Sequence, residues 1–230
     1  MIKYRMEFKK GEAVRFVSHL ELMKVFIQAI NRAGIPVCWT EGFNPRPKIN
    51  FSSAIATGMT SLGECMEMEL AEEIDEEKLQ AMLNRELPDG FRVKRTRRLE
   101  EKQKSLMALL RYADYRVEVP VSPGMEEEET RREVGTFLQE ESIPWTVHTP
   151  KGKKEKDLRP GIVFLEVLET GDKLVLQLRL QSGSSGNVRP EHAVQAFIRH
   201  AGQTPAGVMK IEKQAVYGLK NGEPVYLFDL

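Results

Sequence analysis

The chain has few cysteines, no excess charge of either sign and no long apolar run, and each of these shortages excludes a class of protein. Two cysteines, Cys38 and Cys65, are too few for a secreted disulfide scaffold or for the thiolates of an iron–sulfur cluster. No stretch approaches the roughly 20 apolar residues that span a bilayer, and residues 1–5 lack the apolar run of a signal peptide. We therefore expect a soluble, cytoplasmic protein with no membrane association, metal ion or other cofactor.

Basic and acidic residues balance at 34 each, which excludes a globally basic nucleic-acid binder. The balance hides segregation: the net charge is +5 over residues 1–60, −8 over residues 61–90 and +6 over residues 91–111. Because a phosphate backbone responds to the local field, such blocks are compatible with one positive face. The alternative explanation of the segregation is that neighbouring solvent-exposed faces of opposite charge compensate one another.

The first half of the chain contains apolar patterns for two helices and four strands. Ser18 and Glu21 form a capping box at the start of one helix, which Gly34 and Pro36 end, and Asp75 caps the other. The strands are predicted at residues 2–8, 37–39 with 49–51, 66–70 and 91–97. The resulting order is β-α-β-β-α-β, the ferredoxin-like arrangement.

The second half repeats this order without visible sequence identity. Its strands are predicted at residues 115–121, 162–169, 173–181 and 209–217, with a last strand at 225–228. Its helices are predicted at residues 125–141 and 190–200, and Pro190 suits a first helical turn. We therefore expect an α+β protein of two tandem ferredoxin-like domains, residues 1–99 and 112–230, joined by a helical linker at residues 100–111.

The most distinctive segment is the sequence Phe-Asn-Pro-Arg-Pro-Lys at residues 43–48. Pro45 holds Asn44 extended and Pro47 stiffens the next step, so Arg46 and Lys48 project to the same side. With Phe43 as a stacking surface, the loop suits phosphates and unstacked bases. A rigid connector between two strands is the alternative.

Other candidate residues carry weaker signals. His19 lies in the first turn of a helix beside Arg15, where it is a candidate base or phosphate contact, although a local hydrogen bond explains it as well. Lys24 and Arg32 lie on one helical stripe and extend a basic surface, or form an ordinary solvated face. Arg189 follows the Gly/Ser-rich residues 182–187 before a helix, a position that suits an anion, and a flexible loop is the alternative.

Several segments resemble a bacterial family. They are Arg-Phe-Val-Ser-His-Leu-Glu-Leu at residues 15–22, Arg-Ala-Gly-Ile-Pro at residues 32–36 and Glu-Gly-Phe-Asn-Pro-Arg-Pro-Lys-Ile at residues 41–49. The family is the radical-SAM-linked protein family, a domain of unknown function whose members occur alone or joined to a radical SAM protein. The resemblance implies a radical SAM partner that holds the iron–sulfur cluster. Relatives commonly carry histidine where this chain has Arg46, so the resemblance implies no catalytic role for residue 46.

Three functions compete. The first is an accessory protein of a radical SAM enzyme, without catalytic activity of its own, that binds RNA or another anionic substrate for modification. The second is an RNA-processing enzyme, because tandem ferredoxin-like domains with a histidine in the first helix are similar to CRISPR repeat-cleaving endonucleases. Residues 218–222 match the glycine-rich loop of those enzymes poorly. The third is a protein–protein adaptor that docks through its charge blocks.

Overall fold

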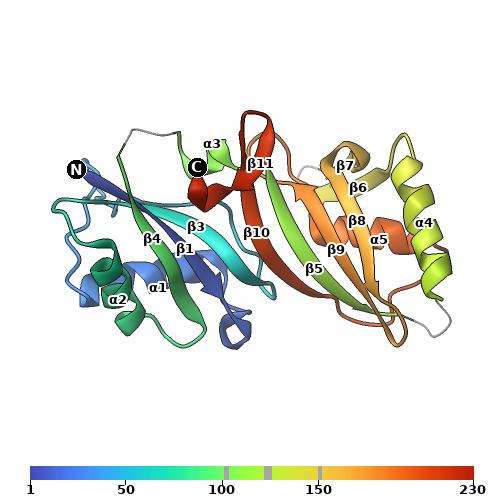
Figure 1. Ribbon diagram of the computed structural model, residues 1–230, viewed down its shortest axis with the longest axis horizontal. Coiled ribbons are helices and arrows are strands. Elements are labelled where there is room, and N and C mark those ends of the chain that lie inside the picture. The colour runs from blue at the N-terminus through green and yellow to red at the C-terminus, as the bar shows by residue number, and fades with distance from the viewer. Residues whose placement is uncertain (101–103, 122–125, 150–151) are drawn as a thin grey trace. The chain divides into compact units, whose positions relative to one another are not determined.

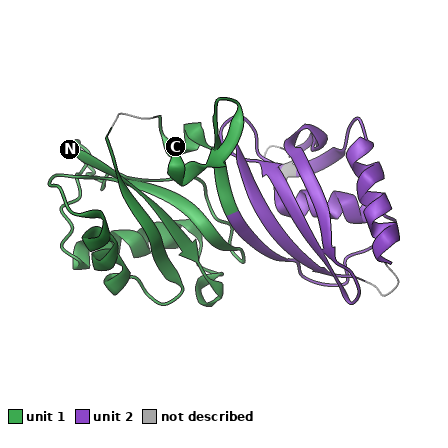
Figure 2. Ribbon diagram, viewed as in Figure 1, with its two compact units in different colours: residues 1–110, 215–230 green, residues 111–214 purple. Residues whose placement is uncertain are grey.

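The computed structural model describes residues 1–100, 104–121, 126–149 and 152–230. The chain divides into two compact units (Figure 2): unit 1 comprises residues 1–110 and 215–230, and unit 2 residues 111–214. Both units combine helices with antiparallel strands, which confirms the α+β class. Residues 215–230 group with unit 1, although in the sequence they come after all of unit 2. No helix among the described residues has the length and apolar character needed to cross a membrane.

Unit 1 begins with six elements in the predicted order (Figure 1). They are β1 (Ile2–Lys10), α1 (His19–Arg32), β2 (Ile49–Phe51), β3 (Thr60–Leu70), α2 (Glu76–Glu86) and β4 (Phe91–Leu99), with a short 3-10 turn, η1 (Glu12–Val14), after β1. β1 pairs antiparallel with β4 and β3, and β3 also pairs with β2, so the strand order is β4-β1-β3-β2. The predicted strand at residues 37–39 is reduced to isolated bridges.

The core of unit 1 contains a cluster of aromatic rings and lies between the sheet and its helices. The Phe8 ring contacts Phe26 of α1, with centroids 4.9 Å apart, and both side chains are fully buried. α1 starts at the predicted capping box: the Ser18 hydroxyl accepts from the Glu21 N–H at 3.3 Å, and the Glu21 carboxylate accepts from the Ser18 N–H at 2.8 Å. α2 starts at the predicted cap, Asp75. Local sequence signals therefore set both helix starts.

The end of the chain completes unit 1. β10 (Lys210–Lys220) turns through Asn221 and Gly222 into β11 (Glu223–Tyr226), and a 3-10 turn, η3 (Leu227–Asp229), follows. Both turn residues have positive φ, 55° and 88°, as a two-residue type I′ hairpin requires. η3 contacts β1, and the Leu227 carbonyl accepts from Arg5 Nη1 at 2.8 Å. Because Arg5 alternates with the core residues of β1, η3 lies on the sheet face opposite the helices.

Unit 2 contains seven main elements (Figure 1). They are β5 (Tyr112–Pro120), α4 (Glu127–Gln139), β6 (Pro144–Thr149), β7 (Gly152–Asp157), β8 (Ile162–Glu169), β9 (Lys173–Gln181) and α5 (Pro190–His200), with a 3-10 turn, η2 (Arg159–Gly161), before β8. β9 pairs antiparallel with β5 and β8. α4 and α5 meet through Phe137 and Phe197, whose ring centroids are 5.5 Å apart.

Two segments differ from the sequence-based expectation. The hairpin of β6 and β7 has no predicted counterpart, because every described residue of β7 is exposed and its sequence, Gly-Lys-Lys-Glu-Lys-Asp, has no apolar alternation. The predicted helical linker is helical only at α3 (Leu106–Leu109) among its described residues, and residues 101–103 lie outside the described part. Residue 125, where a helix was predicted to start, is also outside it, and α4 starts at Glu127.

Candidate functional site

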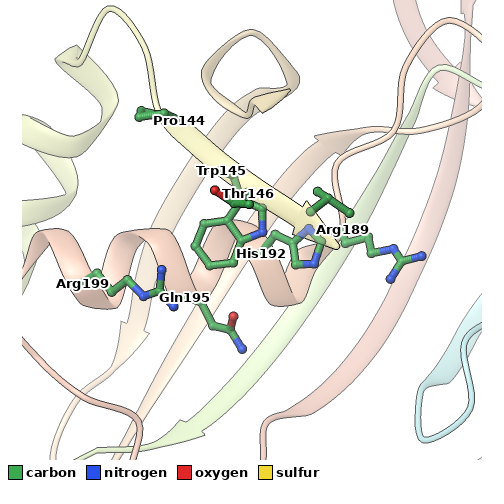
Figure 3. Close-up of a pocket in the computed structure, with 8 residues that line it drawn as sticks. Pro144, Trp145, Thr146, Arg189, His192, Gln195 and Arg199 are labelled. Carbon is green, nitrogen blue, oxygen red and sulfur yellow. The ribbon is translucent and has the colours of Figure 1, made fainter. Parts of the chain in front are cut away.

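A cavity of about 480 Å³ lies between β6 and α5 in unit 2 (Figure 3). Ligand pockets in proteins typically have volumes in this range. The strand and the helix each contribute half of the lining residues, which are Pro144, Trp145, Thr146 and Val147 from β6, and Arg189, His192, Gln195 and Arg199 from α5 and its N-cap.

Helical spacing explains why four polar side chains share this cavity. Arg189, His192, Gln195 and Arg199 follow one another at intervals of three or four residues, which places them on one face of α5. Buried apolar residues of α5, such as Phe197, pack into the core of unit 2. The amphipathic pattern therefore directs the polar face of α5 toward β6.

The indole of Trp145 is the centre of the cavity wall. Its ring centroid lies 4.7 Å from the Arg199 guanidinium carbon and 5.2 Å from the centroid of the His192 ring, which is tilted by 30°. Figure 3 shows Trp145 between these two side chains, with Arg189 beyond His192. Arg199, Trp145 and His192 form a row of flat groups, and the cation–π contact holds Arg199 in place.

The cavity is electropositive. Among the described residues, its lining contains two arginines and no aspartate or glutamate. Burial lowers the pKa of His192, the positive charge of Arg189 lowers it further, and Glu191 opposes the shift. His192 is therefore neutral near pH 7, when its ring offers one donor and one acceptor. Such a lining favours an anionic ligand that also carries a flat group.

A second cavity, of about 320 Å³, shares Pro144, Trp145 and Arg199 with the first. Its other lining residues are more apolar and come from α4, the loop before β6 and α5: Phe137, Glu140, Ser142, Ile143, Ala196 and His200. Trp145 and Arg199 thus border both cavities, and a ligand that contacts this pair has room on either side.

Comparison with known proteins assigns the chain to a family. Residues 3–190 match the family described as "Uncharacterized protein conserved in bacteria (DUF2344)". The chain belongs to this family. The match ends at Pro190, so His192, Gln195 and Arg199 lie beyond the matched part of this DUF2344 protein. No curated protein matches the sequence.

Two solved structures are similar to the DUF2344 chain. One, titled "Crystal Structure of a Cbf5-Nop10-Gar1 Complex", matches with 9% identity and a TM-score of 0.53, over 94% of this chain and 48% of that one. The other, titled "Crystal structure of the archaeal box H/ACA sRNP Nop10-Cbf5 complex", matches with 8% identity and a TM-score of 0.41, over 93% and 46% of the two chains. The chain thus spans about half the length of each. The first likeness concerns the fold alone.

Of the predicted site residues, Arg189 lines the cavity and the others lie in unit 1. In the predicted loop, the Thr40 hydroxyl accepts from the Arg46 N–H at 3.0 Å, and the Arg46 carbonyl accepts from the Thr40 N–H at 2.8 Å. Phe43 is fully exposed, and Asn44 and the Arg46 side chain are also exposed. Lys48 forms an ion pair with Glu69 at 3.3 Å. The binding role of this loop stays a prediction.

The helix-associated candidates occupy separate positions. Arg15 lies over the Phe16 ring at 4.5 Å and pairs with Glu12. His19 packs edge-on against Phe51, with ring centroids 5.6 Å apart. Lys24 is exposed. Arg32 donates to the carboxylate and the backbone carbonyl of Glu86 in α2, at 3.2 and 2.6 Å. Arg32 therefore links two helices, and the functional roles of all four residues stay predictions.

Sequence reasoning missed most of the cavity. The predicted helix carries a polar face formed by His192, Gln195 and Arg199 opposite an apolar one. This amphipathic pattern could have indicated the helix side of the site. Trp145 had no such signal, since it lies on the unpredicted strand β6. The cavity needs both elements.

Proposed function

We propose that this DUF2344 protein binds single-stranded RNA at the cavity between β6 and α5 and presents it to a radical SAM enzyme. The observation that carries the proposal is the lining itself, in which two guanidinium groups and the Trp145 ring share one cavity with no acidic residue among the lining residues that the structure describes. Single-stranded nucleic acids are bound by such combinations of cationic groups for the phosphates and flat surfaces for the bases.

The chemical step belongs to the partner in this proposal. The resemblance of residues 15–22 and 41–49 to radical-SAM-linked proteins supports the choice of partner. Of the two cysteines, Cys65 is buried, and this burial raises the pKa of its thiol, which disfavours the thiolate that ligates iron.

We also propose that both units are ferredoxin-like. Unit 1 has the βαββαβ order with antiparallel pairing. The second half of the sequence follows the same order in β5, α4, β8, β9, α5 and β10 once the β6–β7 hairpin is treated as an insertion after the first helix, and β10 then serves both units, since its residues 215–220 group with unit 1. The insertion is functional in this interpretation, because β6 supplies half of the cavity lining.

Fluorescence anisotropy with a labelled, mixed-sequence single-stranded RNA tests RNA binding. We expect the double variant Arg189→Ala/Arg199→Ala to bind more weakly and to flatten the plot of log affinity against log salt by about 1.4, or roughly 0.7 per lost phosphate contact. Arg132→Ala, which removes an exposed arginine on α4 outside the cavity, is the matched control and should behave like the unaltered protein. Equal affinity and slope in the double variant would contradict the cavity as the RNA site.

The same RNA, analysed on a denaturing gel after incubation, separates binding from cleavage. We expect intact RNA. Discrete fragments that disappear in a His19→Ala variant would instead favour the RNA-processing alternative. The choice of partner is tested by passing bacterial lysate over the immobilised, unaltered protein and identifying the retained proteins by mass spectrometry. We expect a radical SAM protein among them.

A further inference from the structure

An arginine on the covered face of the unit 1 sheet has an unusual environment. Arg97 of β4 lies directly opposite Arg5 of β1 in the antiparallel register. The ring of Phe228, in η3, lies 5.4 Å from the guanidinium carbon of Arg97 and 4.2 Å from that of Arg95. Phe228 is itself buried and covers Arg97, whereas the Arg95 side chain is 44% exposed.

Three other arginines show how this protein uses the Nε–Nη2 edge of a guanidinium. Arg5 donates from both atoms to a single oxygen, Oε1, of Glu67 at 3.0 and 2.8 Å, and Arg131 donates from both atoms to Oε1 of Glu127 at 3.0 and 2.8 Å. Arg179 donates from both atoms to the two oxygens of Asp114 at 2.7 and 2.8 Å. This edge presents two parallel N–H groups that match the two oxygens of a carboxylate or phosphate.

The Nε–Nη2 edge of Arg97 differs from these three in its hydrogen bonding. Its Nε and Nη2 atoms are buried, yet no group in the described parts of the chain accepts a hydrogen bond from them. Burial lowers the pKa of Arg97, and the charge of Arg5 contributes to the shift. Native proteins rarely bury charged donors without an acceptor, because their lost hydration is not replaced.

The charges around Arg97 do not neutralise it by a direct pair. Arg5 is paired with Glu67, which also binds Lys3 at 2.7 Å. Arg95 is paired with Glu7 and, at 3.3 Å, with Asp229 of η3. The neighbouring carboxylates are therefore already engaged by other cations.

We propose that the Nε–Nη2 edge of Arg97 binds a small oxyanion, a phosphate or carboxylate group, between the unit 1 sheet and Phe228. Such a ligand supplies two acceptor oxygens in the geometry that Asp114 provides for Arg179. This site is independent of the cavity in unit 2, because it uses other residues in another unit. The enclosure by η3 favours a small ion or a terminal group over an internal segment of a polymer.

Thermal unfolding in potassium phosphate, potassium acetate and potassium chloride, at matched ionic strength, tests the site. In the unaltered protein we expect the preferred oxyanion at ten times its Kd to raise Tm by roughly 3–6 °C above the value in chloride. Arg97→Lys keeps the positive charge but loses the bidentate fork, so this increment should disappear. Arg92→Lys, at an exposed position on the same strand, should retain it.

The comparison between variants is essential, because phosphate stabilises proteins generally by exclusion from their surface. An equal Tm increment in the unaltered protein, Arg97→Lys and Arg92→Lys would overturn the proposal. The phosphate and acetate arms distinguish which oxyanion is preferred.

A direct binding measurement keeps the proposal testable if Arg97→Lys unfolds too easily. Titration calorimetry of Asp229→Asn with inorganic phosphate or acetate should show tighter binding than the unaltered protein, because a competing negative charge beside Arg97 is removed. Weaker binding in Asp229→Asn, or no binding in either protein, would contradict the proposed site.

Discussion

The two units manage their cations differently. In unit 1, three cations of the basic strand β4 are matched by carboxylates from distant parts of the chain: Lys94 and Arg95 pair with Glu7, and Arg98 pairs with Glu73. In unit 2, the described lining of the cavity between β6 and α5 contains cationic groups and no carboxylate. A block of basic sequence therefore indicates a positive surface less well than a few arginines that share one cavity.

The comparison also separates buried charge from exposed charge. Arg5 and Glu67 are at most 1% exposed and form a pair within unit 1, whereas Arg131 and Glu127 pair on the exposed surface of α4 in unit 2. The same side-on hydrogen-bond geometry occurs in both pairs. Their energetic importance should differ greatly, because water screens only the exposed pair.

The largest effect should follow from breaking the buried pair. We expect Glu67→Gln to reduce the free energy of unfolding by about 3–5 kcal/mol, because it leaves the Arg5 charge buried without a counterion. Urea denaturation followed by circular dichroism measures this change. Glu127→Gln, the matched change on α4, should cost less than about 0.5 kcal/mol. Similar losses in both variants would mean that burial does not distinguish the two pairs.

The sequence predicted local features better than distant contacts. Ser18, Glu21, Asp75 and Pro190 mark helix starts through interactions within a few residues, and all four predictions are confirmed. The pairing of basic β4 with Glu73 was beyond sequence analysis, because it depends on tertiary structure. For the same reason the charge blocks did not reveal which cations share a surface.

The candidate site shows the same limit. Arg189 was predicted because it precedes a helix, and it does line the cavity. Trp145 was missed because β6 pairs with a fully polar strand, which the hydrophobic pattern cannot detect. A site that combines a helix face with an inserted hairpin can be predicted only where both elements carry a pattern of their own.

A smaller effect is expected at the exposed loop of unit 1. Phe43 is fully exposed, which excludes the role of a core anchor. Phe43→Ala should therefore change stability by less than about 0.5 kcal/mol. If the loop binds RNA, loss of the stacking surface should weaken RNA binding by about 1–3 kcal/mol with little change in salt dependence. Paired melting and anisotropy measurements check both values, and Tyr226→Ala, another exposed aromatic of unit 1, is the control.

The pH dependence of RNA binding should sharpen the contrast between the units. The folded-state pKa of His192 lies below 6.5, so the residue is neutral at pH 7 and gains charge only as the pH falls through this lowered value. The added charge should strengthen RNA binding by roughly fivefold, since one charge at 4 Å in water contributes about 1 kcal/mol. The gain should be absent in His192→Ala, measured by anisotropy between pH 7.5 and 5. An identical pH profile in that variant would remove His192 from the binding surface.

The smallest expected effect concerns the two cations of the unit 1 loop. The Arg46 side chain is exposed, whereas Lys48 is already paired with Glu69, so the two should not contribute equally to RNA binding. If the loop binds RNA, Arg46→Ala should flatten the plot of log RNA affinity against log salt by about 0.7, the value for one phosphate contact on a single strand. Lys48→Ala should change the slope less, because Glu69 competes with the phosphate for the ammonium group. Equal slopes in Arg46→Ala and the unaltered protein would assign RNA binding to unit 2 alone and leave the loop free for a protein partner.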